Sequence, residues 1–256
     1  PIVEKAAPKS TVPGEWTSPT QPMPLAPPRL SRSGFTDADV TNRTPEAAES
    51  VRKQLKSLVY GKEHLPPSIQ GTLVAPGFHG GATWSGASFD PETGILYINT
   101  NDIPSVMGLT ANGRGGYDFN GYQWFNDHEG FPGIKPPWGW LTAVDLNKGT
   151  FAWRRVFGAY PELEAKGQKG LGAQSFGGTI VTKGGLVFIG GSPDEKFRAY
   201  DKLTGKELWA ADLGAGGYAT PCTYMVNGKQ YVVIAAGGGG KLGTKSGNKY
   251  IAFAID

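Results

Sequence analysis

The sequence predicts an all-β fold of stacked or radially arranged sheets, and three observations support this prediction. First, residues 143–153 and 199–209 carry Ala, Asp, Gly and Trp at the same offsets, so a hairpin unit repeats after 56 residues. Second, the 256 residues include 39 glycines and only 18% charged side chains, which suits a chain with many tight turns. Third, short apolar strands separated by Gly-containing turns follow one another through the second half of the chain.

Each copy of the repeat has the residue pattern of a β-hairpin. In the first copy, a strand over 140–144 ends at Asp145, whose carboxylate accepts hydrogen bonds from the backbone two residues on and starts a turn. Gly149 provides the positive φ that the return needs, and Trp153 ends the next strand. We expect this Trp, and its counterpart in the second copy, to lie across the gap to a neighbouring sheet, where an indole buries about 200 Å².

Less regular copies of the hairpin extend the pattern along the chain. They cover residues 90–98, 177–191 and 224–236, and a last strand covers 250–255. The last hairpin contains Asn227-Gly228, the strongest short-range hairpin signal. Grouping the strands gives about three blades of a β-propeller, over 72–157, 174–213 and 217–256. The third blade lacks its outermost strand, and propellers often complete such a blade with a strand from the other end of the chain.

The first 71 residues are predicted to form a segment distinct from the blades of residues 72–256. Residues 1–35 are Pro-rich and strand-poor, so we expect them to be extended against a larger surface. Residues 36–56 are predicted to be helical, with Thr44 as N-cap and Pro at the first helical position. Residues at about 103–139 form a long insertion rich in Gly and aromatic residues, a kind of loop that usually carries function.

Composition argues against several classes of function. The net charge of +3 is too small to favour binding to nucleic acid or to an anionic membrane surface. The sequence also has no run of 18 apolar residues that could span a membrane. The chain contains no Walker loop, Ser-His-Asp constellation or dinucleotide fingerprint. His64, His79 and His128 lack metal-ligand spacing, and the single Cys222 is expected to be a small buried core residue. Since the chain begins without Met or a secretory signal, we expect a processed chain or a fragment.

Several motifs together resemble the C-terminal part of quinoprotein dehydrogenases of the glucose dehydrogenase type, which bind pyrroloquinoline quinone (PQQ). The motifs are residues 14–22, 66–72, 80–86 and 137–140 and the long run 216–245. The resemblance covers essentially the whole chain. It implies a partial eight-bladed β-propeller of about three blades, preceded by an N-terminal extended and helical segment, with the quinone near the propeller axis.

The resemblance also implies a reaction. In that family PQQ, a planar tricarboxylate, takes two electrons from an alcohol or from the anomeric carbon of a sugar. A Ca²⁺ ion polarises the reactive carbonyl, and an Asp accepts the substrate proton. These enzymes are periplasmic and pass electrons to a quinone or a cytochrome.

In the family, the catalytic Asp, the main metal ligands and the Trp under the quinone lie upstream of the matched segment. We therefore expect no catalytic or metal-binding residue here, and no activity without the remaining N-terminal blades. Those blades would come from another chain, from a missing part of this one or through self-association.

Five residues are candidates for contact with the cofactor. Trp84 follows a Gly-rich turn, as the family Trp beside the quinone does, although an inter-blade wedge is the alternative. Gly239, Gly240 and Lys241 lie in a loop that the family places near the quinone, where glycine N–H groups can approach an anion; a plain turn with a solvated Lys is the alternative. Asp194 is either a polar contact near the axis or a turn former.

Three further polar residues follow a predicted strand. Asn99 and Asn101 either point to the axis or cap the strand, and Asp102 is the one carboxylate considered as a substitute base. Many family members have a His where this chain has Gly239, which leaves the substrate preference open. The alternative function is a non-catalytic β-propeller segment that serves as a scaffold or binding module.

Overall fold

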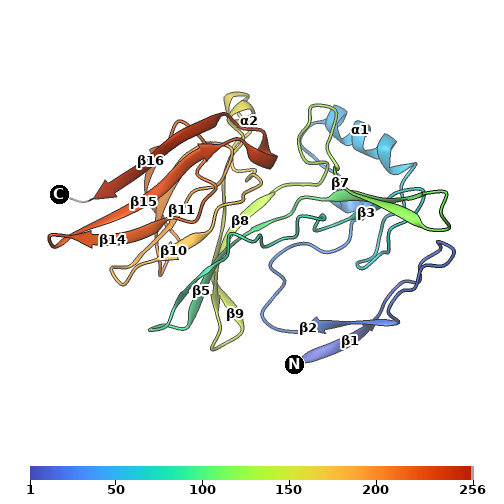
Figure 1. Cartoon of the computed structure of the whole chain (residues 1–256), viewed down its shortest axis with the longest axis horizontal. Helices are drawn as coiled ribbons and strands as arrows, with labels where there is room; N and C mark the ends of the chain where they lie inside the picture. Colours follow the sequence, from blue (N-terminus) through green and yellow to red (C-terminus); the bar gives the residue numbers. More distant parts are fainter. Residues whose placement is uncertain (255–256) are drawn as a thin grey trace. The chain divides into compact units, whose positions relative to one another are not determined.

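The computed structural model describes residues 1–254, which divide into two compact units. The first unit contains Pro1–Gly81 and Asp102–Trp138, and the second contains Ala82–Asn101 and the chain from Gly139 onward (Figure 1). Each unit is built on antiparallel β-sheets, so the all-β prediction is confirmed. Within the described residues, no helix combines the length and the hydropathy needed to cross a membrane.

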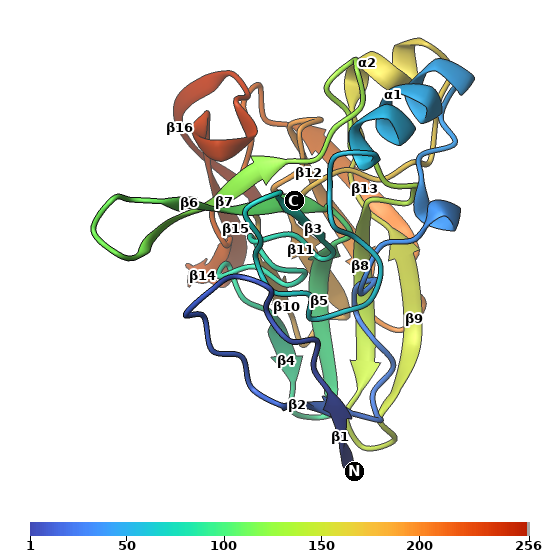
Figure 2. The same ribbon diagram turned by 90° about the vertical axis from the view of Figure 1, so that its right-hand side faces the viewer.

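The second unit holds three antiparallel sheets. The first has the order β4-β5-β8-β9, the second β10-β11-β12-β13 and the third β14-β15-β16. Their bounds are Ser88–Asp90 (β4), Ile95–Asn101 (β5), Gly139–Asp145 (β8), Thr150–Val156 (β9), Thr179–Val181 (β10), Leu186–Ile189 (β11), Lys196–Asp201 (β12), Glu207–Asp212 (β13), Cys222–Val226 (β14), Lys229–Gly238 (β15) and Ser246–Ala254 (β16). Strands β5, β8 and β9 run side by side in Figure 2. The second and third sheets correspond to the predicted blades over 174–213 and 217–256, whereas the first sheet contains only part of the predicted blade over 72–157.

The duplicated hairpins are equivalent in three dimensions. Ala143 lies opposite Trp153 in the β8–β9 pair, and Ala199 lies opposite Trp209 in the β12–β13 pair. In both hairpins the register shifts directly after the Ala, which marks a β-bulge at the same place. The repeat therefore specifies the register as well as the turn.

The Asp of each repeat starts its turn as predicted. Asp145 Oδ1 accepts the N–H groups of Asn147 and Lys148 at 3.0 and 3.1 Å. Asp201 Oδ1 accepts those of Leu203 and Thr204 at 3.0 and 2.7 Å. These hydrogen bonds satisfy backbone N–H groups that the tight turn between the two strands would otherwise leave unpaired.

Two apolar clusters fill the spaces between the sheets. One joins the first two sheets through Tyr97, Leu141, Ala143, Trp153, Phe157, Val187, Ile189 and Tyr200. The other joins the second and third sheets through Phe197, Leu213, Ala215, Val232, Ile234 and Ala236. Trp153 is a wedge of the expected kind, because it is only 8% exposed and its Nε1 donates to the carbonyl of Lys202 at 2.9 Å.

The third sheet has three strands in the described part of the chain, as predicted, with β16 at one edge. Most side chains of β16 are exposed, and Tyr250 leaves 84% of its surface accessible. The predicted strand 250–255 matches β16 up to Ala254, while Ile255 lies outside the described residues. Cys222 is exposed, so its predicted place in a buried core is wrong; all five residues of β14 are exposed.

The first unit begins with a two-stranded sheet. Strands β1 (Ile2–Ala6) and β2 (Thr20–Pro24) pair antiparallel, so the expectation of a strand-poor N-terminal stretch is wrong. The β-branched Ile2 and Val3 favour an extended backbone, and the ladder forms although all of β1 is exposed. The prolines of this region leave its short strands intact, because a strand at an edge tolerates a missing N–H.

The predicted helix forms only in part. A 3₁₀ turn, η1 (Asp37–Asp39), precedes the helix α1 (Pro45–Leu55). Thr44 is the N-cap as predicted, since its Oγ1 accepts the N–H of Ala47 at 3.1 Å. The two remaining short helices, α2 (Pro161–Ala165) and η2 (Gly240–Leu242), lie in the second unit.

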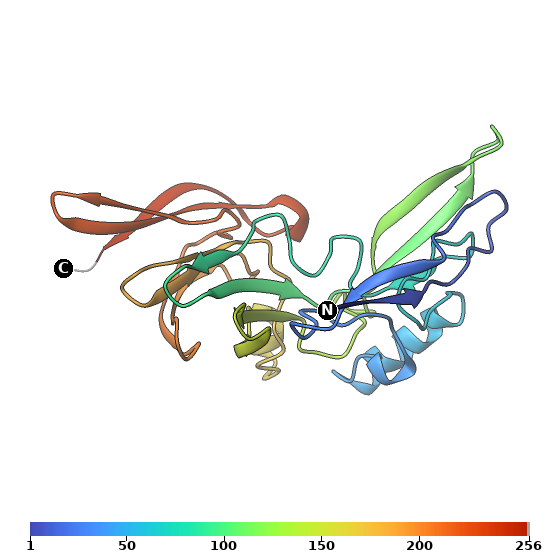
Figure 3. The same cartoon turned by 90° about the horizontal axis from the view of Figure 1, so that it is seen from below.

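The boundary at residue 72 differs from the prediction. Strand β3 (Thr72–Val74) pairs with β6 (Ser105–Ala111), and β6 pairs with β7 (Tyr117–Trp124), all in the first unit. The predicted insertion of 103–139 thus contributes a hairpin, light green in Figure 3, to the same sheet as β3. This pairing could not be predicted from the sequence, because β3 and β6 are about 30 residues apart and two strands of another sheet lie between them along the chain.

Candidate cofactor site

Loops from the three sheets of the second unit meet at one end. In an antiparallel sheet with this strand order, the segment before the first strand and the connection between the second and third strands lie at the same end. Trp84 precedes β4, Phe176 precedes β10 and Thr220 precedes β14, while Lys241 lies between β15 and β16. The contacts of Trp84 with Phe176 and Lys241, and that of Thr220 with the neighbouring Ser85, define the candidate site.

Trp84 presents an exposed aromatic surface at this end. Its ring stacks on Phe176 with a centroid distance of 5.2 Å and an interplanar angle of 22°. Phe176 is 5% exposed, whereas Trp84 is 70% exposed. A wedge between sheets buries its ring, as Trp153 does, so the geometry of Trp84 is that of a supported platform instead.

A cation lies close to this platform. Lys241 Nζ is 5.4 Å from the centroid of the Trp84 ring, within the range of a cation–π interaction. The indole and the ammonium group together can receive a flat, negatively charged molecule, because the ring offers a stacking surface and the ammonium group offers an opposite charge.

The glycines before Lys241 shape its loop. Gly239 and Gly240 have φ values of +65° and +62°, which side chains other than glycine rarely adopt. The N–H of Gly239 already donates to the carbonyl of Thr244 at 3.1 Å, and the N–H of Gly238 donates to Gly216 at 2.8 Å. These two amides are engaged by backbone, so in this structure the positive charge of the loop comes from Lys241.

Asp194 lies in a buried ion pair. Its carboxylate pairs with Arg198 and also accepts the hydroxyl of Ser192 at 2.5 Å. Burial on its own would lower the pKa of Arg198, but the hydrogen bond and charge of Asp194 raise it above its ordinary value. A carboxylate neutralised in this way fits the turn-forming alternative better than a contact with an anionic cofactor, and Asp194 also accepts the N–H of Lys196 at 3.3 Å.

The two asparagines at the end of β5 hold the segment before Phe176. Asn101 Oδ1 accepts the N–H of Ser175 at 2.8 Å, and Asn101 Nδ2 donates to the Ser175 carbonyl at 2.9 Å. Asn99 Nδ2 donates to Ser175 Oγ at 2.8 Å, and all three residues are buried. The amides thus replace a missing β-ladder partner and fix the backbone under the Trp84 platform.

The remaining polar candidates lie elsewhere. Asp102 belongs to the first unit, where it accepts the backbone N–H of Arg32 at 2.7 Å and pairs with the Arg32 side chain at 3.1 Å. His79 stacks on Trp124 with a centroid distance of 4.2 Å. Across residues 1–254 no group of three or more His, Cys, Asp or Glu side chains has an arrangement that could hold a metal ion.

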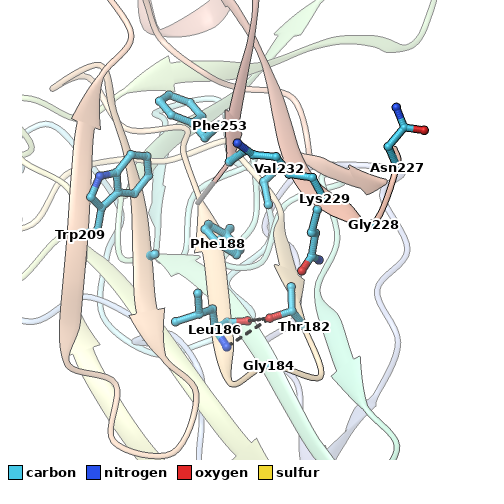
Figure 4. A pocket seen from close by; sticks show the side chains of 13 residues that line it. Thr182, Gly184, Leu186, Phe188, Trp209, Asn227, Gly228, Lys229, Val232 and Phe253 are labelled. Atoms are coloured by element: carbon cyan, nitrogen blue, oxygen red, sulfur yellow. Dashed lines mark hydrogen bonds between the residues drawn. The ribbon is translucent and has the colours of Figure 1, made fainter. Parts of the chain in front are cut away.

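A hollow between the second and third sheets was not expected from the sequence. It encloses about 880 Å³ and includes side chains from both sheets, among them Leu186, Phe188, Trp209, Val232 and Phe253 (Figure 4). The β10–β11 turn at Gly184 and the β14–β15 turn at Gly228 border it, so it is at the opposite end of the sheets from Trp84. Sequence analysis likewise missed Phe176, which lies in no motif, and gave no role to Thr220, although Thr220 lies in the motif run 216–245.

Comparison with known proteins gives consistent matches. The PQQ family model described as "Glucose/ethanol/alcohol dehydrogenase, beta-propeller domain" matches residues 1–232. Quinoprotein glucose dehydrogenase A of Acinetobacter calcoaceticus is 35% identical over the whole chain, which covers 35% of that protein. The glycerol dehydrogenase large subunit of Gluconobacter thailandicus is 32% identical over the whole chain, which covers 40% of it.

The solved structures agree with these matches. Quinohemoprotein alcohol dehydrogenase from Comamonas testosteroni superposes with a TM-score of 0.53 and 28% identity, covering 72% of this chain and 27% of that one. The predicted fold class, a partial propeller, is confirmed. The chain spans little more than a third of the length of the curated relatives named above.

Proposed function

Because this chain belongs to the PQQ-dependent glucose/ethanol/alcohol dehydrogenase β-propeller family, we propose that it is the C-terminal portion of such a dehydrogenase and forms one wall of its quinone site. The substrate is a sugar of the glucose type or an alcohol, and the electrons pass to a quinone or a cytochrome. The proposed location is the periplasm. The observation that carries this proposal is the exposed Trp84 ring, supported by Phe176 and approached by Lys241.

The residues at this end of the sheets fit a planar tricarboxylate. Trp84 offers a flat apolar surface on which an aromatic cofactor stacks and from which it excludes water. Lys241 offsets one carboxylate, and its flexible stem lets the ammonium group follow that carboxylate. When bound, PQQ supplies the two-electron chemistry, while the residues of this chain hold and orient it.

The other parts of the reaction require residues from elsewhere in the protein. We assign the Ca²⁺ ligands and the Asp that accepts the substrate proton to the remaining blades, as the family resemblance implies. The third sheet supports the need for such blades, since Tyr224, Met225 and Val226 are 44 to 62% exposed. An apolar strand exposed in this way normally packs against another sheet.

Quinone titration of the full-length protein tests the proposal. With PQQ and Ca²⁺ present, we expect saturable quenching of tryptophan fluorescence, and reduction of an artificial acceptor with glucose, glycerol or simple alcohols. Replacing Trp84 by Ala should raise the quinone Kd about tenfold or more, since a stacked aromatic contact of roughly 1.4 kcal/mol is lost. Trp16→Ala is the matched control, because Trp16 is 81% exposed and lies in the first unit.

The outcomes separate enzyme from scaffold. A protein that binds no PQQ under these conditions overturns the proposed quinone site. Tight PQQ binding with no reduction by any sugar or alcohol leaves the site but defeats the dehydrogenase assignment in favour of a non-catalytic binding module. Equal effects of Trp84→Ala and Trp16→Ala would show that the Trp84 ring is not part of the wall.

A further inference from the structure

The turn that carries Trp84 has few contacts of its own. Residues 82–86 are exposed or half-buried, and within the turn Gly86 N donates to Thr83 O over a long 3.3 Å. An exposed indole on such a turn would sample several rotamers. Beyond the bridge between Ala82 and Thr100 of β5, the contacts that hold this turn at Phe176 come from the other two sheets.

Ser85 connects the turn to both neighbouring sheets. Its Oγ donates to the carbonyl of Phe176, the residue under the Trp84 ring. Its own carbonyl accepts the hydroxyl of Thr220 at 2.8 Å. Gly178 lies against the same carbonyl, and a Cβ at that position would collide with Ser85 O. Ser85 is thus held on both sides by segments that precede the first strands of the second and third sheets.

The segment with Thr220 also reaches the loop that carries the cation. The Tyr218 hydroxyl and Thr244 Oγ1 are 2.6 Å apart, which is a short hydrogen bond. Thr244 in turn accepts the N–H of Gly239 through its carbonyl at 3.1 Å. Two side chains two residues apart therefore contact the Trp84 turn on one side and the Lys241 loop on the other.

We infer that residues 218–220 form a brace that sets the position of the Trp84 ring relative to Lys241, with Thr220 and Tyr218 as positioning residues. The inference rests on the proposed function in assigning the ring and the cation to a quinone. Thr220 is exposed, so water could replace Ser85 as the hydrogen-bond partner of its hydroxyl at little cost in stability. Its removal should accordingly change the site more than the stability of the fold.

Fluorine NMR of the full-length protein labelled with 5-fluorotryptophan tests the brace without requiring bound quinone. The Trp84 resonance is identified as the one that Trp84→Phe removes. We expect Thr220→Val to shift or broaden this resonance, and Thr220→Ser, which keeps the hydroxyl, to restore it. Thr223→Val is the matched control, because Thr223 is an exposed threonine whose hydroxyl donates to Tyr231 O at 2.8 Å, outside the site.

Quinone titration then measures the consequence. Thr220→Val and Tyr218→Phe should each raise the quinone Kd about threefold to tenfold, the range that corresponds to one lost hydrogen bond. The melting temperature should stay as in the Thr223→Val control. An unchanged Trp84 resonance in Thr220→Val overturns the inference even if the protein binds PQQ. A perturbed resonance in a protein that binds no PQQ supports the brace and defeats only its assignment to a quinone.

Discussion

The two repeat tryptophans give a quantitative test of how the sheets are held together. Trp153 is 8% exposed, and its indole N–H donates to Lys202 O at 2.9 Å. Gly205 lies so close to its ring that a Cβ there would overlap it. Trp209 has the equivalent register position but is 38% exposed, so it buries about two thirds as much of its surface as Trp153.

The difference in burial predicts a difference in stability. Trp153→Ala should lower the free energy of unfolding of the second unit by about 5 kcal/mol, of which roughly 4 kcal/mol comes from the cavity and lost burial and about 1 kcal/mol from the hydrogen bond. Trp209→Ala should cost about 2.5 to 3 kcal/mol by the same scaling.

Urea denaturation of this chain, followed by far-ultraviolet circular dichroism, measures both costs. The two variants remove the same side chain from equivalent positions, so each is the control for the other. A cost for Trp153→Ala no larger than that for Trp209→Ala would refute the assignment of Trp153 as the principal wedge between the first two sheets.

Three more changes probe the same contact between sheets. The Lys202 ammonium group donates a hydrogen bond to Asp90, with Nζ 2.8 Å from Oδ2, and holds the pKa of Asp90 below its usual 3.8. The stability that this ion pair contributes is therefore present above pH 3.8 and is lost as the pH falls through the lower pKa of the folded state. Lys202→Met should remove this contribution and flatten the acid limb of a pH–stability profile. Burial raises the pKa of Tyr97 to about 12, so stability falls as pH rises from about 10 towards 12, and Tyr97→Phe should reduce that alkaline loss in the same profile. Gly205→Ala should cost at least about 1 kcal/mol in urea unfolding, because φ is +66° and a Cβ meets the Trp153 ring; a neutral effect would contradict the close approach.

The sequence was informative wherever the determinants are local. Asp145 with Gly149, and Thr44 with Pro45, act within four residues of one another, so their chemistry can be read directly from their spacing. The same holds for the repeat, whose two copies form hairpins with Ala opposite Trp, a pairing that the structure adds to the predicted turns. Such elements depend on backbone conformation and on hydrogen bonds to near neighbours.

The candidate site depends on separations that a single sequence does not reveal. Ser85 contacts a residue 91 positions away and Thr220 one 135 positions away, and both contacts arise only when the three sheets pack. Asp194 could be recognised as a turn residue, but its pairing with Arg198 four residues on, across Glu195 with a φ of +58°, has no signal in the sequence. The prediction of a buried Cys222 was wrong for a different reason, because apolar composition cannot distinguish a buried strand from an uncovered one.

The rings of Trp153 and Trp209 differ in what covers them. Between the first and second sheets, the turn that contains Lys202 and Gly205 covers the Trp153 ring. Between the second and third sheets, the corresponding position is the hollow of Figure 4, which Trp209, Phe188 and Phe253 line. A strand from the rest of the proposed propeller, paired along β16, would bring a turn to this place and bury the indole further.

The cost of Trp209→Ala should therefore rise in the full-length protein towards the roughly 5 kcal/mol expected for Trp153→Ala, while the latter stays the same in both contexts. Pulse proteolysis in urea measures the local stability of this region in either length of protein. Equal costs of Trp209→Ala in the two lengths would mean that no added segment covers the ring, and the completed third sheet would have to be abandoned. Because Trp84 lies at the opposite end of the sheets, its quinone titration should not respond to either substitution so long as the fold is retained.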